Sequence, residues 1–255
     1  MRFIPSVYGV DSGRKKKVVF GIPIPKSQPP HPQTVQSLKD SVAAIEEAGW
    51  NHGYTQTTGN PYISGARAEI TRRALDAGAD VIFYIDYDVS WRPQDLIKLL
   101  TTEGDVVAGT YRCKTDNRDE ILYMGAIHND PIDNKPIGRL SDFALKAKVA
   151  PAGFLKVTTA AIDHFMRCYP DLCYGPQYSL SVDLFHHGAH KGLWWGEDYA
   201  FCRNYIDCGG EVWIVPDLNI DHWQGDYAYR GNFHEYLLRQ PGGDKFQPEG
   251  ELTCH

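Results

Sequence analysis

Two aspartates stand two positions apart, directly after an apolar run. Asp86 and Asp88 follow Val81–Ile85, and the combined sequence is VIFYIDYD. Two carboxylates this close repel each other unless a cation lies between or beside them. Hard oxygen ligands of this kind suit Mg²⁺ or Mn²⁺. The spacing therefore indicates a divalent-cation site, and the plain alternative is a loop in which one aspartate caps the following helix.

A second acidic pair and a histidine lie far downstream. Glu197 and Asp198 open a helix predicted over 196–208. A carboxylate beside an acceptor hydroxyl can take its proton, which typically speeds a transfer by ~10²–10⁴-fold. Asp198 is the first candidate for this base and Glu197 the second, although the helix dipole equally favours acids in a first turn. His222 follows a short strand over 211–215, and we favour a metal-ligand role for it over a half-buried position beside a tryptophan, since Mn²⁺ tolerates imidazole.

The segments that must position these residues alternate between strand and helix. Strands are predicted over 18–23, 80–85 and 105–109, and helices over 36–48, 63–77 and from Pro93 onward. The stretch 53–61 is polar and turn-rich, as expected of a loop. This alternation predicts an α/β fold with an open, mostly parallel twisted sheet flanked by helices, in which ligands bind beyond the carboxyl ends of the strands. The second half is less regular, with hairpin signals over 122–135 and a helix over 159–168.

Composition supports one folded domain. The chain has 255 residues, 42% of them hydrophobic, and a net charge of −6, which argues weakly against a broad nucleic-acid groove. No apolar run approaches the ~20 residues of a membrane helix, and the first ten residues do not resemble a secretory signal. The six cysteines form no CxxC pair, so we expect reduced, mostly buried thiols in a cytoplasmic protein rather than a structural zinc site.

Taken in order, the motifs resemble those of small GT-A-type glycosyltransferases. The resemblance spans roughly residues 18–225. It is carried by SGAR (64–67), ADVIFYIDYD (79–88), WRPQDL (91–96), VVAGTYRCK (106–114), PAGFL (151–155), WGEDYAFC (195–202) and DHW (221–223). Each motif alone is loose, but the ordered set is more specific.

The resemblance implies a single glycosyltransferase domain with a GT-A-like, Rossmann-like nucleotide-binding half. That half would cover about 18–115, an acceptor half about 116–225, and a C-terminal flap or tail about 226–255. The implied activity is metal-dependent transfer of a hexose or pentose from a UDP- or GDP-type nucleotide sugar to an acceptor hydroxyl. The acceptor would be a glycan, a small molecule or, for a virus- or phage-encoded enzyme in the host cytoplasm, a hydroxymethylated DNA base.

Site roles follow from the same resemblance. Asp88 would bind Mn²⁺ or Mg²⁺ directly together with His222, and Asp86 would contact the ion through water or contact the ribose. Lys114 can equally be a solvated loop charge. The expected donor-binding residues are Pro23, Arg67, Asp86, Tyr87, Lys114 and Trp195.

Two other classes of function stay open. A nucleotidyltransferase would usually carry a Gly- and Arg-rich phosphate loop after the first strand, and the segment 22–25, which is IPIP, offers none. A non-catalytic carbohydrate-binding protein would not need the intact acidic and histidine set. The histidines at 186, 187 and 190 favour a surface loop or a lid over a zinc site, because they lack an HExxH frame.

Overall fold

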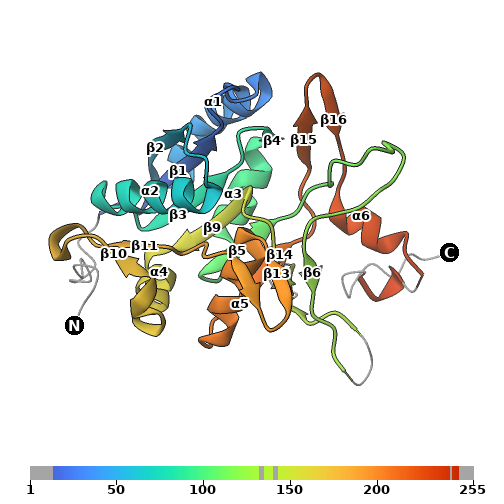
Figure 1. Ribbon diagram of the computed structural model, residues 1–255. Helices are drawn as coiled ribbons and strands as arrows, with labels where there is room; N and C mark the ends of the chain where they lie inside the picture. Colours follow the sequence, from blue (N-terminus) through green and yellow to red (C-terminus); the bar gives the residue numbers. More distant parts are fainter. Residues whose placement is uncertain (1–13, 132–134, 140–142, 242, 247–255) are drawn as a thin grey trace.

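The computed structural model describes residues 14–131, 135–139, 143–241 and 243–246. Their core is one nine-stranded sheet with helices on both faces (Figure 1). The strand order is β2-β1-β3-β9-β5-β14-β8-β6, and β7 pairs with β8. The strands are β1 (Lys17–Ile24), β2 (Asn51–Thr58), β3 (Val81–Ile85), β5 (Val106–Gly109), β6 (Ala126–Ile127), β7 (Gly138–Arg139), β8 (Ala144–Val149), β9 (Phe154–Thr158) and β14 (Val212–Val215).

Seven of these strands point the same way, and only β8 and β9 run against them. The predicted α/β class with an open, mostly parallel sheet is therefore confirmed.

The helices are α1 (Pro32–Glu47), α2 (Ile63–Asp76), α3 (Pro93–Thr101), α4 (Thr159–Cys168), α5 (Glu197–Asp207) and α6 (Phe233–Leu238), with short 3₁₀ turns η1 (Pro170–Leu172), η2 (Gln177–Ser179) and η3 (Gly243–Phe246). None of the described helices is long and apolar enough to cross a bilayer.

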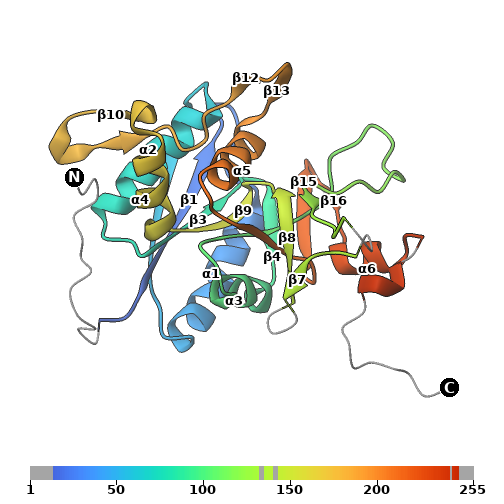
Figure 2. The same ribbon diagram turned by 90° about the horizontal axis from the view of Figure 1, so that it is seen from below.

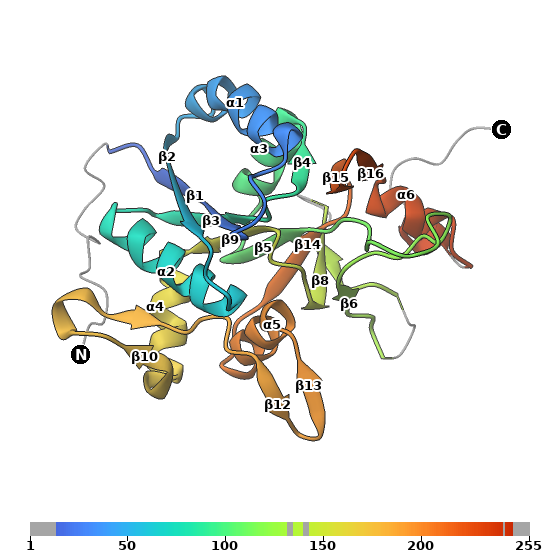
Figure 3. The same ribbon diagram turned by 45° about the horizontal axis from the view of Figure 1, so that its top comes forward.

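The two faces of the sheet bury separate cores. Along β3, Phe83 packs toward α1 and α3, while Ile82 and Tyr84 pack toward α2, α4 and α5. Figure 3 shows these two helix layers on opposite sides of the strands. Alternate side chains of a strand point to opposite faces, so a strand covered on both sides has to be apolar throughout. This explains why VIFYI carries no charged residue before Asp86; its one polar side-chain group, the Tyr84 hydroxyl, is paired with the Thr71 hydroxyl at 2.7 Å.

The predicted loop over 53–61 is wrong, because β2 occupies most of it. β2 is the edge strand of the sheet and pairs with β1 alone. Its backbone bonds hold it there while its side chains face solvent. Tyr54 is 50% exposed, and Thr57 is the one β2 residue that is buried. An exposed polar edge strand has no apolar pattern, so the sequence carries little signal for it.

Two element boundaries differ from the predictions. The first strand continues through Pro23 to Ile24, because β1 pairs with β3 only as far as Gly21 and with β2 beyond it. A proline without an N–H is tolerated where one neighbouring strand has ended. The first helix begins at Pro32 rather than at 36, because the His31 side chain accepts a hydrogen bond from the Gln33 N–H at 3.3 Å and caps it.

Three small sheets complete the fold. The three-stranded sheet β16-β15-β4 joins β4 (Val89–Trp91), β15 (Ile220–Gln224) and β16 (Tyr227–Tyr229). The hairpin of β12 (Gly188–His190) and β13 (Leu193–Trp195) projects next to α5 (Figure 2), and β10 (Cys173–Tyr174) pairs with β11 (Ser181–Val182). In the β4–β15 register His222 lies opposite Val89, which brings it beside Asp88.

Candidate active site

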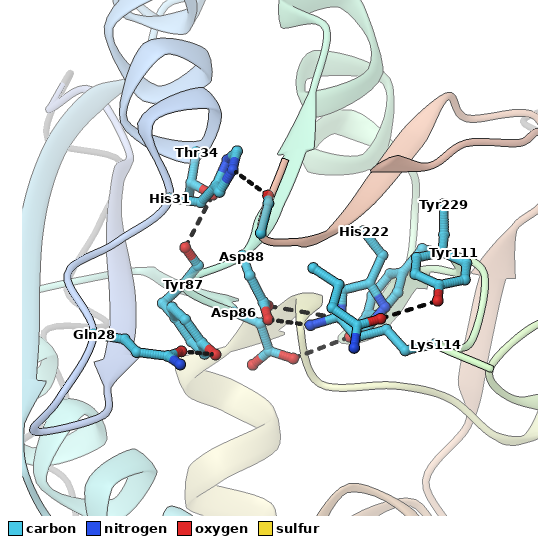
Figure 4. A network of polar contacts seen from close by, with 12 residues as sticks. Gln28, His31, Thr34, Asp86, Tyr87, Asp88, Tyr111, Lys114, His222 and Tyr229 are labelled. Carbon is cyan, nitrogen blue, oxygen red and sulfur yellow. Dashed lines mark hydrogen bonds and ion pairs between the residues drawn. The ribbon is translucent and has the colours of Figure 1, made fainter. Parts of the chain in front are cut away.

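The two aspartates diverge at the end of β3. The Asp86 N–H donates to the Gly153 carbonyl at 3.0 Å, and the Val89 N–H donates to the Asp86 carbonyl at 3.3 Å, so residues 86–89 form a tight turn. As Figure 4 shows, this turn directs Asp86 toward Tyr111 and Asp88 toward His222 and Lys114. One short motif thus supplies carboxylates to two different sets of partners.

Asp86 is held by buried donors. Arg67 Nη2 lies 2.9 Å from one carboxylate oxygen, and the Tyr111 hydroxyl donates to the other at 3.1 Å. Burial alone would raise the pKa of Asp86, but the charge and hydrogen bond of Arg67 outweigh it and hold that pKa below its usual range. Asp86 therefore stays ionised, with both oxygens already occupied.

Arg67 connects three parts of the site from its position on α2. Its side chain is 3% exposed, and besides Asp86 it contacts Glu197 at 3.4 Å through Nη2 and the Ala152 carbonyl at 3.3 Å through Nη1. Charge-assisted bonds of this kind are strong when they are shielded from water. Arg67 therefore ties the end of β3 to the N-terminus of α5.

Gly153 leaves the room that this arrangement needs. A β-carbon at this position would overlap the Tyr111 hydroxyl and the Asp86 carboxylate. The floor of the site under Asp86 is therefore bare backbone, supplied just before the antiparallel strand β9 begins. This function of the PAGFL segment was not predicted from the sequence.

We expect Gly153→Ala to displace Asp86 and to lower turnover by about 10²-fold, since a shift of about 1 Å at a reacting centre costs that much. Overpacking should also lower the free energy of unfolding by roughly 1–3 kcal/mol. Donor turnover and chemical denaturation check the two effects. Gly53→Ala on the edge strand is the matched control, because a β-carbon there meets only ordinary contacts. Wild-type turnover in Gly153→Ala would contradict the packing account.

Asp88 and His222 form the second set of contacts. His222 Nε2 lies 3.7 Å from an Asp88 carboxylate oxygen, and the side chains are 13% and 10% exposed. The other ring nitrogen, Nδ1, lies 2.9 Å from the Arg112 carbonyl, which can only accept, so Nδ1 carries the proton. The Nε2 lone pair is therefore free and directed toward the carboxylate, as in histidines that ligate metals.

The charges around His222 favour its neutral form. Burial lowers the pKa of His222 below its usual value, and the nearby Lys114 ammonium lowers it further. A neutral imidazole is the form that binds a metal ion. Lys114 Nζ contacts the second oxygen of Asp88. The donor set of one carboxylate and one free imidazole nitrogen fits Mn²⁺ or Mg²⁺, with Asp86 close by in the same turn.

Asp198 lies at the N-terminus of α5, on the other side of Arg67. Its Oδ1 accepts a hydrogen bond from the Tyr199 N–H at 2.8 Å. Burial, followed by the charge of Glu197, raises the pKa of Asp198 to about 7. Glu197 itself is engaged by Arg67. Asp198 is thus able to exchange a proton near neutral pH.

The remaining predicted residues lie around this centre. The Tyr87 hydroxyl donates to Gln28 Oε1 at 2.6 Å, which turns the ring toward the segment after β1. Pro23 lies near the carboxyl end of β1, opposite Thr57. Trp195 has the Arg203 guanidinium 4.8 Å above its ring, so it packs along α5. The donor-binding roles of all three stay predictions.

Tyr111 is a site residue that the sequence reasoning missed. It is buried, donates to Asp86, and packs edge-on against the His222 ring with the centroids 4.9 Å apart. It therefore contacts both the Asp86 and the Asp88–His222 sets. Its place directly after β5, at the same sheet edge as Asp86, was the available signal.

Comparisons with known proteins come from structure alone. No family model matches the sequence, and no curated protein matches it. A structure of GalNAc-T7 with UDP, GalNAc and Mn²⁺ is 12% identical, with a TM-score of 0.45 over 85% of this chain and 46% of that one. The catalytic domain of Drosophila β1,4-galactosyltransferase 7 is 11% identical, with a TM-score of 0.44 over 92% and 82%.

A third similar structure belongs to another class of enzyme. The inositol-1-phosphate CTP transferase from T. maritima is 10% identical, with a TM-score of 0.42 over 94% of this chain and 98% of that one. All three are likenesses of fold, at sequence identities of 10–12%. This chain spans less than half of the GalNAc-T7 chain. The geometry of the site carries the function proposed below.

Proposed function

We propose that this protein is a metal-dependent glycosyltransferase that moves a sugar from a nucleoside-diphosphate sugar to an acceptor hydroxyl. The observation that carries the proposal is the free Nε2 of His222, directed at Asp88 from 3.7 Å in a largely buried setting. A carboxylate and a neutral imidazole from distant parts of the chain meet there at the carboxyl edge of the sheet. Nucleotide ligands bind at that edge in open α/β folds.

The donor side of the site is built to stabilise a leaving diphosphate. Asp88 and His222 would hold Mn²⁺ or Mg²⁺, which supplies positive charge against the charge that develops on the leaving group. Lys114 adds an ammonium beside Asp88. Both terminal nitrogens of Arg67 already contact Asp86, Glu197 or the Ala152 carbonyl, so its proposed role is to position the acids.

The acceptor side centres on Asp198. Its carboxylate takes the proton of the attacking hydroxyl while the acceptor oxygen bonds to the anomeric carbon. The bond from that carbon to the phosphate oxygen breaks, and its electron pair leaves with the nucleoside diphosphate. A direct displacement of this kind inverts the anomeric centre. Glu197 positions the helix terminus through Arg67.

The proposed donor is a UDP- or GDP-type hexose or pentose. The proposed acceptor is a hydroxyl of a glycan or small molecule, and a hydroxymethylated base in DNA is a less favoured acceptor. The cytoplasm is the proposed place of action. The five cysteines in the described part of the chain are free thiols, as a reducing compartment would keep them.

A thermal-shift screen tests this proposal first. We expect one of UDP, GDP, CDP and TDP to raise the Tm only when Mn²⁺ is present. A ligand at ~100 times its Kd adds about 2.7 kcal/mol to the native state, which gives a clear shift. No shift for any pair would contradict the proposal, and so would release of pyrophosphate during turnover, because a nucleotidyltransferase releases pyrophosphate.

A further inference from the structure

A second group of metal-binding side chains lies away from the acidic site. His164, Cys168 and Cys208 each offer one ligand atom, and the three atoms lie within 4.8 Å of one another. In the part of the chain that the structure describes, this is the one such group of three found. None of the three residues contributes to the site around Asp88.

Two helices create the cluster. His164 and Cys168 are four positions apart on α4 and therefore share one face of it. Cys208 is the residue that ends α5. The helices lie side by side under the sheet (Figure 1), and the Tyr169 hydroxyl joins them by donating to the Asn204 carbonyl at 3.0 Å. The ligand atoms thus sit on a rigid framework rather than on a loop.

The donor set differs in kind from the acidic site. Two sulfurs and one imidazole nitrogen are soft ligands that select Zn²⁺ over Mg²⁺ or Mn²⁺. With Zn–S near 2.3 Å and Zn–N near 2.0–2.1 Å, tetrahedral ligands lie about 3.5–3.8 Å apart. Cys168 Sγ and His164 Nε2 are 3.8 Å apart, which is close to that spacing. The two side chains need little movement to share one ion.

Cys208 and His164 now hydrogen-bond to backbone carbonyls through protons that a metal ion would displace. The Cys208 thiol donates to the Tyr205 carbonyl at 3.2 Å, and His164 Nε2 lies 2.8 Å from the Cys208 carbonyl. Burial, followed by the adjacent Cys168 thiol, raises the pKa of Cys208 to about 12. Metal binding would break these hydrogen bonds and release protons.

We propose that His164, Cys168 and Cys208 bind one Zn²⁺ ion, with water in the fourth position on the side where Cys168 is exposed. The ion ties the C-terminal end of α4 to the C-terminal end of α5. Asp198 stands at the opposite end of α5, which is 11 residues or ~16 Å long, so the zinc stabilises that helix and takes no part in sugar transfer. This site is independent of the glycosyltransferase proposal.

Metal titration of the reduced protein tests the site. We expect one Zn²⁺ per chain, a rise in Tm, and a thiolate-to-cobalt charge-transfer band when Co²⁺ replaces Zn²⁺. Cys168→Ser should weaken the band, since only Cys208 remains as a thiolate ligand, and weaken binding by roughly tenfold or more, because a hydroxyl is a poor ligand for this ion. Its side chain is exposed, so the variant should fold.

Matched variants separate this site from others. Cys173→Ser, which changes a half-buried cysteine outside the cluster, and Asp88→Ala should both keep wild-type Zn²⁺ affinity. Unchanged binding in Cys168→Ser would overturn the proposal. Loss of binding in a His187→Ala/His190→Ala variant would overturn it as well, by moving the site to the β12–β13 hairpin. Failure of the reduced protein to bind Zn²⁺, with Cys168 and Cys208 forming a disulfide in air, would show a redox pair instead.

Discussion

Asp88→Ala is expected to lower donor turnover by about 10³-fold or more. The variant removes the carboxylate that faces the His222 Nε2 and the Lys114 ammonium. A metal ion contributes several kcal/mol of charge stabilisation to such transition states, and about 4 kcal/mol corresponds to about 10³-fold. The measurement is nucleoside-diphosphate release from the donor at saturating Mn²⁺, together with the Mn²⁺-dependent nucleotide affinity.

The control for this variant is Asp226→Ala, which removes an exposed carboxylate from the turn between β15 and β16. It should keep wild-type turnover and nucleotide affinity. Wild-type turnover in Asp88→Ala would contradict the metal-binding role of Asp88, even if the fold is the one described.

Asp198→Asn is expected to lower transfer by ~10²–10⁴-fold and to remove a limb of the pH profile. A general base works only when it is deprotonated, and the pKa of Asp198 is raised to about 7 by burial and Glu197. Wild-type activity should therefore rise as pH increases through about 7 and level off above it. Glu197→Gln should keep this limb, because Glu197 acts through Arg67. The limb should lie at lower pH, since the Glu197 charge that helps to raise the pKa of Asp198 is gone. A wild-type profile that is flat from pH 5 to 9 would rule out Asp198 as the base.

The stability of the protein should also depend on the protonation of Asp198, but it should fall with rising pH where activity rises. Because its folded pKa lies above the ordinary value of 3.8, the folded state holds a proton that the unfolded state loses first. The contribution of Asp198 to stability is therefore fully present below about pH 4 and is lost as pH rises to about 7. Asp198→Asn, which stays neutral, should have a higher Tm than the wild type at pH 8 and a similar one at pH 4.

Sequence patterns predicted the parts of the fold that bury apolar side chains. The buried strand β3 and the helices α2 and α4 match the expected ranges closely, because their periodicity reflects the two cores. The edge strand β2 escaped prediction because its hydrogen bonds come from the backbone and its side chains are exposed.

The candidate site was predicted as a set of residues but not as a geometry. Asp88 was expected to bind the ion directly and Asp86 to contact the ion through water or to contact the ribose. In the structure, the turn after β3 directs Asp86 to Arg67 and Tyr111. Arg67 lies on α2 and Tyr111 follows β5, so the local sequence around Asp86 does not specify these contacts. The ligands of the proposed zinc site were not predicted for the same reason: the sequence holds no CxxC pair, and only the packing of α4 against α5 brings Cys208 to Cys168.

The pairing of β15 with β4 also has a consequence for how this chain folds. The hydrogen bond from the Trp223 ring to Ser90 closes a loop of 133 residues, and closures of that length are slow and costly in entropy. During synthesis, the aspartates of the turn emerge long before His222. A nascent or truncated chain therefore carries half of the proposed cation site, and Asp88 and His222 could bind one ion together only in the complete fold. Cation affinity would then serve as a readout of completed folding, as well as of readiness for catalysis.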